Sequence, residues 1–143
     1  MQELKDRIVK EGKVLPGNII KVDGFLNHRI DTELMDHIAE EFGKHFNMDE
    51  VTMILTAEAS GIALSAIVAH HFHKPMIFAK KAKSDNIEGG LYQSDIFSYT
   101  YKKKVTRLVS KEWLSADDKV LIIDDFMANG EAMRGLCDIV NAA

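Results

Sequence analysis

Apolar and polar residues recur along the chain with the periods of helices and strands. In segment 32–46 the apolar residues return at every fourth position, at Leu34, Ile38, Phe42 and Phe46. This spacing predicts an amphipathic helix with one face on a core, and Asp31, directly before it, is a favourable N-cap. A second, shorter amphipathic helix is predicted over 1–12, where Gly12 ends the pattern.

Three short apolar runs predict buried strands, at 51–56, 76–79 and 120–123. A helical pattern follows the first run at 62–73, and another follows the third run from Ala132 to the last residue. Helices that alternate with strands indicate an α/β fold. Because the strands are apolar throughout rather than alternating, they are typical of a parallel sheet covered on both faces.

Two segments depart from this alternation. Residues 13–31 contain the turn pair Pro16-Gly17 followed by apolar pairs, and we expect them to be extended or irregular. In 86–110, the glycines Gly89-Gly90 precede residues that alternate in polarity. This pattern predicts an antiparallel excursion that is mobile near its glycine and lysine residues.

The composition narrows the class of protein. With 143 residues, 46% of them hydrophobic and 28% charged, the chain fits one domain with a real core. A net charge of -4 argues against a nucleic-acid partner, which would need a basic excess. One cysteine excludes a disulfide within the chain and favours the cytosol. The apolar runs are too short to span a membrane, and the N-terminus does not resemble a signal peptide.

Two of the predicted strands end in small or acidic residues that lead directly into a helix. The units are 53–65, "MILTAEASGIALS", and 120–132, "VLIIDDFMANGEA". In open α/β sheets, ligands bind at the carboxyl ends of the strands, and the N-terminus of a helix suits phosphate. Two such units in one small domain predict a ligand with two separate phosphate groups.

The second unit places Asp124 and Asp125 side by side at the end of its strand. Because like charges repel and the desolvation of carboxylates is costly, an adjacent pair at a buried strand end indicates a functional role. Carboxylates can accept hydrogen bonds from vicinal hydroxyls or hold a divalent metal. A phosphorylated ribose fits both the phosphate loops and the carboxylates. The alternative is a capped strand end with one solvated carboxylate.

The segment "VLIIDDFMANGEA" resembles the phosphoribosyl pyrophosphate (PRPP) motif of type I phosphoribosyltransferases. With "LPGNIIKVDGFLNHRID", "SGIA" and "FAKK", the chain resembles the bacterial xanthine phosphoribosyltransferases over essentially its whole length. The resemblance implies a single α/β domain over 1–143, with a parallel sheet flanked by helices, an N-terminal hood and a flexible antiparallel insertion. Family members continue past the last predicted helix. We therefore expect the domain to lack their C-terminal segment, which includes a base-contacting lysine.

The resemblance also implies a role for each part of the site. Asp124 and Asp125 are expected to hold the ribose hydroxyls as the catalytic pair. The 5′-phosphate is expected at the loop of Ala128, Asn129, Gly130, Glu131 and Ala132. The pyrophosphate loop, often with a non-proline cis peptide, is expected at Ala57, Glu58, Ala59, Ser60 and Gly61, with Lys80 and Lys81 nearby. The base-contacting residues are expected to be Ile20 and Asn27.

The implied reaction transfers the phosphoribosyl group of PRPP to xanthine, giving xanthosine 5′-monophosphate and pyrophosphate. Mg²⁺ is expected to arrive with PRPP rather than on protein ligands, and an insertion around 84–104 is expected to close as a lid. Glu131 is unusual in a phosphate loop and is expected to turn its side chain outward. The resemblance further implies a cytoplasmic homodimer. Two alternatives remain: an enzyme for adenine, guanine or hypoxanthine, and a non-catalytic PRPP-binding regulatory module or remnant.

Overall fold

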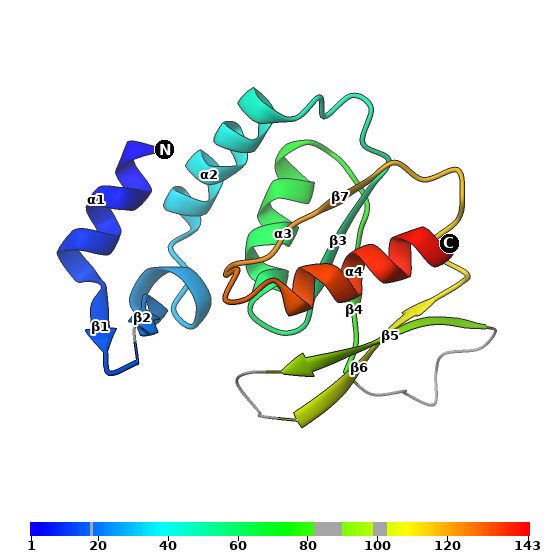
Figure 1. The fold of residues 1–143 in the computed structure, drawn as a ribbon. Coiled ribbons are helices and arrows are strands. Elements are labelled where there is room, and N and C mark those ends of the chain that lie inside the picture. The colour runs from blue at the N-terminus through cyan, green and yellow to red at the C-terminus, as the bar shows by residue number, and fades with distance from the viewer. Residues whose placement is uncertain (18, 82–89, 99–102) are drawn as a thin grey trace.

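The computed structural model describes residues 1–143 except 18, 82–89 and 99–102. Three parts lie side by side (Figure 1): an N-terminal helix and hairpin, a central sheet with its helices, and a second hairpin beneath the last helix. No helix among the described residues is both long and apolar enough to cross a membrane.

The central sheet has three parallel strands in the order β4-β3-β7. The middle strand, β3 (Met53–Ala57), places Leu55 opposite Ile77 of β4 (Met76–Ala79) and Ile122 of β7 (Val120–Ile122). All three strands run in the same direction, so the loops that follow β3 and β7 emerge at the same edge. The predicted parallel α/β sheet is confirmed.

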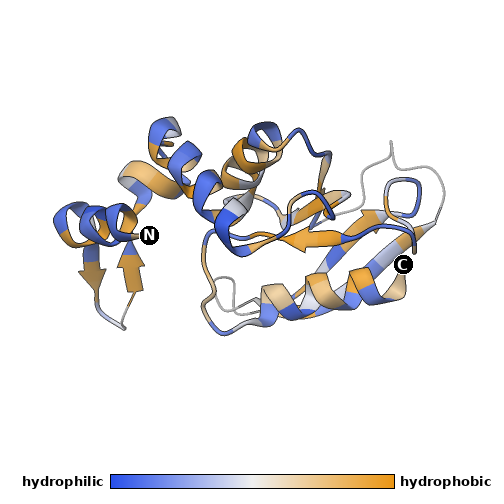
Figure 2. Cartoon of the chain, turned by 90° about the horizontal axis from the view of Figure 1, so that it is seen from above, coloured by the Kyte–Doolittle hydropathy of each residue, from blue (hydrophilic) through white to orange (hydrophobic). Residues whose placement is uncertain are grey.

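Helices cover both faces of this sheet. Successive residues of a strand point to opposite faces, so Ile54 joins a core with α2 (Thr32–His45) and α3 (Gly61–His71), whereas Leu55 joins a core with α4 (Glu131–Ala142). Both of these β3 side chains are fully buried. The strands of the sheet are largely hydrophobic, whereas the outlying α1 (Gln2–Glu11) is mostly hydrophilic (Figure 2).

Helix α2 follows its predicted pattern closely. Asp31 caps it, because its side-chain oxygen accepts a hydrogen bond from the Leu34 amide at 3.2 Å. Leu34 and Ile38 are buried against the core. The pattern fails only at its end: Phe46 lies past the last helical residue and is 46% exposed. There it stacks on Phe42 instead of entering the core.

Segment 13–31 is more regular than expected. Strands β1 (Lys13–Leu15) and β2 (Ile19–Lys21) form an antiparallel hairpin, and Gly17 adopts a positive φ of 86° beside its turn. A single π-helical turn, η1 (Asp23–Asn27), then buries Phe25 and Leu26. Paired apolar residues gave no alternation from which short, exposed strands could be predicted. This N-terminal part, residues 1–31, corresponds to the expected hood.

The excursion after β4 is an antiparallel hairpin of β5 (Leu91–Ser98) and β6 (Lys103–Ser110), as predicted. It lies against α4, where the Ser94 hydroxyl donates to Asp138 at 2.9 Å. Gly135 lets the two elements approach, because a Cβ there would collide with Ile96. Much of the expected lid, residues 82–89 and 99–102, lies outside the described residues, so the lid stays a prediction.

Candidate active site

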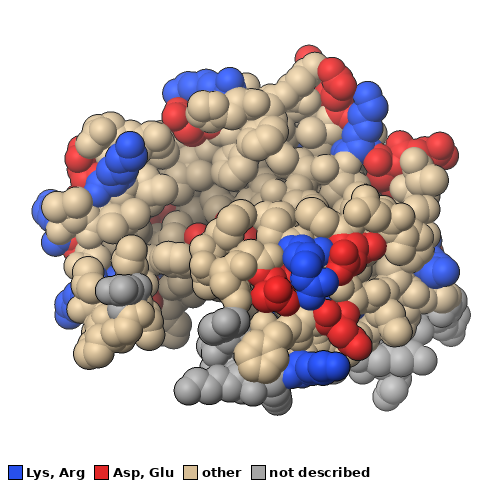
Figure 3. All heavy atoms as spheres, viewed as in Figure 1, with Lys and Arg blue, Asp and Glu red and all other residues tan. Residues whose placement is uncertain are grey.

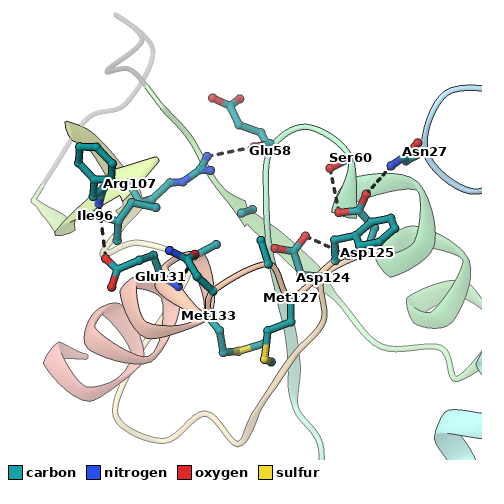
Figure 4. A pocket seen from close by; sticks show the side chains of 17 residues that line it. Asn27, Glu58, Ser60, Ile96, Arg107, Asp124, Asp125, Met127, Glu131 and Met133 are labelled. Carbon is teal, nitrogen blue, oxygen red and sulfur yellow. Dashed lines mark hydrogen bonds between the residues drawn. The ribbon is translucent and has the colours of Figure 1, made fainter. Parts of the chain in front are cut away.

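A pocket of about 340 Å³ opens at the carboxyl edge of the sheet. Its walls come from the loops after β3 and β7, the first turn of α4, Asn27 of the hood and three hairpin residues (Figure 4). These hairpin residues are Ile96, Phe97 and Arg107. The pocket therefore joins segments from all three parts of the fold.

Asp125 is fixed between two of these walls. Its Oδ1 accepts a hydrogen bond from the Ser60 hydroxyl at 2.8 Å, and its Oδ2 accepts one from the Asn27 amide at 3.0 Å. The Asp124 side chain folds onto the backbone of the next residue. Its Oδ1 accepts a hydrogen bond from the Asp125 backbone N–H at 3.0 Å. Because each carboxylate is held by a defined partner, the pair is oriented before any ligand binds.

Asp124 lies in an unfavourable place for a charge. Burial, and then the negative charge of Asp125, raise the pKa of Asp124 to about 6, while the Arg107 guanidinium opposes this rise. A carboxyl with a pKa near neutrality responds strongly to a nearby cation or hydroxyl donor. Perturbed carboxyls in a pocket are typical of functional sites.

Gly61 packs against Thr56 and against the same carboxylate. A Cβ at this position would collide with Thr56 Oγ1 and would lie only 2.6 Å from Asp124 Oδ1. The first residue of α3 must therefore lack a side chain, which explains the glycine of the "SGIA" segment. The close approach also brings the N-terminus of α3 beside the acidic pair.

The expected pyrophosphate loop is held from three sides. The Glu58 amide donates to the Ala79 carbonyl at 3.2 Å, and the Glu58 carboxylate accepts from the Lys81 backbone N–H. Arg107 Nη1 donates to the Glu58 carbonyl at 3.0 Å. The peptide bond between Glu58 and Ala59 is cis, as the resemblance implied. The end of β4 and the middle of β6 thus frame the loop.

The expected phosphate loop leads directly into α4. Gly130 has φ of 80°, a left-handed conformation that favours glycine, and Glu131 begins the helix. Unpaired N–H groups of a helix N-terminus are suited to an anion. Loop and helix together therefore present backbone donors to the pocket.

The Glu131 carboxylate is hydrogen bonded within α4 and to β5. It accepts from Arg134 at 3.0 Å and, weakly, from the Phe97 amide of β5 at 3.5 Å. These bonds, the one to Arg134 foremost, lower the pKa of Glu131. Arg134 also pairs with Asp138 at 2.9 Å, so acidic and basic side chains gather over α4 (Figure 3). The negative charge of the Glu131 carboxylate is therefore compensated by the neighbouring Arg134.

The structure brings together most, but not all, of the expected site residues. Those that line the pocket are Asn27, Ala57, Glu58, Ser60, Asp124, Asp125, Ala128, Asn129, Gly130, Glu131 and Ala132. Those that do not are Ile20, Ala59, Gly61, Lys80 and Lys81. Ile20 lies 45% exposed on β2, and Lys80 lines a separate cavity beside Trp113.

The pocket wall also holds residues that were not among the expected site residues: Ile96, Phe97, Arg107, Phe126, Met127 and Met133. One signal was available for Arg107, which interrupts the otherwise largely apolar run "VTRLV" in a predicted strand. An arginine is almost never buried without a partner, and Arg107 is only 8% exposed. Such a residue indicates a local negative charge or a ligand.

The matched family model is described as a phosphoribosyl transferase domain, and it covers residues 25–143. The chain therefore belongs to the phosphoribosyltransferase family. Within that family it is 54% identical over 140 residues to xanthine phosphoribosyltransferase of Lachnoclostridium phytofermentans, covering 98% of this chain and 72% of the relative. It is 48% identical over 144 residues to xanthine phosphoribosyltransferase of Bifidobacterium animalis subsp. lactis, covering 100% and 75%.

Solved structures support the same fold at much lower identity. The adenine phosphoribosyltransferase (APRTase) of Giardia lamblia, complexed with 9-deazaadenine, matches with a TM-score of 0.78 and 21% identity, covering 97% of this chain and 76% of that one. The Saccharomyces cerevisiae adenine phosphoribosyltransferase matches with a TM-score of 0.77 and 15% identity, covering 99% and 82%. At such identities the likeness shows the fold alone.

Proposed function

We propose that the protein transfers the phosphoribosyl group of PRPP to xanthine, giving xanthosine 5′-monophosphate and pyrophosphate in purine salvage. The observation that carries the proposal is the position of Asp124 and Asp125 in one pocket between two phosphate-type loops. The relatives named above, which are xanthine phosphoribosyltransferases at 48% and 54% identity, support the choice of base.

The geometry suggests how PRPP lies in the pocket. The first turn of α4 and its loop receive the 5′-phosphate, and the loop 57–61 receives the pyrophosphate. Asp124 and Asp125 then accept hydrogen bonds from the ribose hydroxyls between them. Asn27, bonded to Asp125 at 3.0 Å, brings the hood next to the ribose and the purine.

In the reaction the bond from the anomeric carbon to pyrophosphate breaks while a purine ring nitrogen bonds to that carbon. The protein mainly positions the two substrates and stabilises developing charge. The fixed orientation of Asp125 holds the ribose in register with both loops. Asn27 of the hood and Phe97 of the hairpin also line the pocket, and a site that excludes water protects an activated sugar from hydrolysis.

Mg²⁺ would serve this site as a partner of PRPP. Carboxylate oxygens such as those of Asp124 and Asp125 are the ligand type that Mg²⁺ prefers, and this ion commonly binds through one or two carboxylates and substrate phosphates. The described residues contain no group of three or more His, Cys, Asp or Glu side chains that could form a protein cage. Bound there, the ion would neutralise charge on the leaving pyrophosphate.

A cytoplasmic homodimer is part of this proposal. The N-terminal hairpin leaves Val14 77% exposed and Ile19 58% exposed, and Trp113 is 61% exposed elsewhere on the surface. Exposed apolar patches often mark association surfaces, and a lone cysteine suits a reducing compartment. Light scattering tests the dimer: a mass of one chain at every concentration would contradict it.

The activity is tested by measuring nucleotide formation spectrophotometrically with PRPP, Mg²⁺ and each of four purines: xanthine, guanine, hypoxanthine and adenine. We expect the highest kcat/KM with xanthine. A preference for another purine would overturn the choice of base. PRPP binding without turnover of any of the four would favour the regulatory or remnant alternative.

A further inference from the structure

We propose that Arg107 of β6 binds the pyrophosphate group of PRPP and thereby joins the β5–β6 hairpin to the pyrophosphate loop. The inference rests on the proposed function of the pocket and assigns a substrate-binding residue beyond the two loops and the acidic pair. Arg107 belongs to none of the four segments that carry the family resemblance.

The position of Arg107 is unusual for an arginine. Its neighbours Leu108 and Val109 are core residues, and Arg107 itself is only 8% exposed. Yet its side chain reaches the pocket wall, where Nη1 donates to the Glu58 carbonyl at 3.0 Å (Figure 4). A guanidinium buried at this depth needs negative charge or acceptors around it. The Glu58 carbonyl and the Asp124 carboxylate supply part of this, and a bound pyrophosphate adds further negative charge and further acceptors.

The charges of the pocket point the same way. Among the described residues that line it, the acidic ones are Glu58, Asp124, Asp125 and Glu131. Arg107 is the one Lys or Arg among those lining residues. Arg134 already pairs with Glu131 at 3.0 Å, so the carboxylates that remain are those of Glu58, Asp124 and Asp125. PRPP is strongly anionic, so this wall needs a cation in addition to any Mg²⁺. The planar fork of a guanidinium matches phosphate oxygens.

The location of Arg107 favours the pyrophosphate over the other ligand groups. It is bonded to the loop that follows β3, whereas the expected 5′-phosphate loop follows β7. Asn27 and the hood approach Asp125 from the other side of the pocket (Figure 4). Lys80 and Lys81, which the sequence suggested for this role, do not line the pocket. Arg107 thus takes the place expected for them.

The test compares two ligands on one variant. Arg107→Gln removes the charge, and calorimetry then measures magnesium pyrophosphate and ribose 5-phosphate separately. We expect pyrophosphate to bind at least about tenfold more weakly, the range for a lost charged hydrogen bond. Ribose 5-phosphate, which lacks the pyrophosphate, should change by less than about twofold. Arg107→Lys, which keeps the charge, should recover part of the pyrophosphate affinity.

Lys119→Gln is the matched control. It removes the same charge from an exposed side chain, paired with Glu50 at 3.1 Å, directly before β7 and so at the opposite end of the sheet. Circular dichroism checks the fold of every variant. If Arg107→Gln does not fold, Arg107→Lys decides: a loss confined to pyrophosphate supports the proposal.

The comparison of the two ligands separates a charge effect from a structural one. Because Arg107 is only 8% exposed, salt screens its charge little, so the selective loss in Arg107→Gln should persist as KCl rises from about 50 to about 300 mM. Unchanged pyrophosphate affinity, or an equal loss for both ligands, would overturn the role of Arg107. A parent protein that binds neither PRPP nor pyrophosphate would instead overturn the proposed function.

Discussion

Asp124 shows at the scale of one residue how the site is held at a cost to stability. Its pKa is raised from 3.8 to about 6, chiefly by burial. In the folded state the carboxyl therefore keeps its proton at pH values where the unfolded chain has lost it. The resulting penalty on folding is absent below about pH 4, grows as pH rises, and is complete above about pH 6.

Asp124→Asn should accordingly stabilise the protein near neutral pH. We expect a gain of about 1–2 kcal/mol at pH 7, after allowing for solvent screening at a partly exposed group, and almost none at pH 4. Thermal melts at both pH values measure it. The same variant should bind PRPP more weakly. A stability difference that does not change with pH would contradict the assigned pKa.

Gly61 is the second residue on which the acidic pair depends. Gly61→Ala places a Cβ against Thr56 Oγ1 and 2.6 Å from Asp124 Oδ1, so Thr56, the carboxylate or the start of α3 must shift. We expect a loss of about 1–3 kcal/mol in the free energy of unfolding and weaker PRPP binding. Gly24→Ala is the control, because nothing lies within 4 Å of its added Cβ. Equal effects at both glycines would contradict the account.

At the scale of elements, the hairpin is coupled to α4 through one close approach. A Cβ on Gly135 would collide with Ile96 and reach Ser94 Oγ at 3.5 Å. Gly135→Ala should therefore move β5 away from α4 and weaken the hydrogen bond from the Ser94 hydroxyl of β5 to Asp138 of α4. Hydrogen exchange should rise in 91–98 while the amides of β3 stay protected. Protection of β5 equal to that of the parent protein would show that α4 does not hold the hairpin.

The elements differ in how well the sequence could predict them. Strands β3 and β7 are continuous apolar runs, and α2 has both a stripe and an N-cap, so local pattern and tertiary burial agree there. Strands β1 and β2 are three residues each and wholly exposed. The pair Pro16-Gly17 marks the turn between them, but no burial period marks the strands themselves. The π-helical turn η1 has no sequence signature of its own.

For the molecule as a whole, the parallel sheet is what assembles the site. Ser60 and Asp125 are 65 positions apart and Asn27 and Asp125 are 98 apart, yet both pairs are hydrogen bonded. The acidic pair and its loop could be located from sequence, because a strand end fixes where such residues emerge. The bond between Arg107 and Glu58 depends on how the hairpin folds back, and no local pattern encodes it.

Lys80 is the converse case, because it was expected near the pyrophosphate and does not line the pocket. Its place after a strand suggested an anion site, but it shares a strand face with Phe78, and both line the separate cavity. The backbone of Lys80 is meanwhile bonded in both directions to Leu108 of β6. If the alternation of side chains in β4 is continued by one residue, Lys80 falls on the same face as Phe78. Its side chain then points away from the pocket.

The central claim is that the pocket at the carboxyl edge of the sheet binds PRPP through its acidic pair. The most direct measurement is a calorimetric titration of PRPP with Mg²⁺ into the parent protein, Asp125→Asn and the charge control Lys119→Gln. We predict a loss of at least about tenfold in affinity for Asp125→Asn alone, with circular dichroism unchanged. Equal affinity for PRPP in all three proteins would contradict the claim.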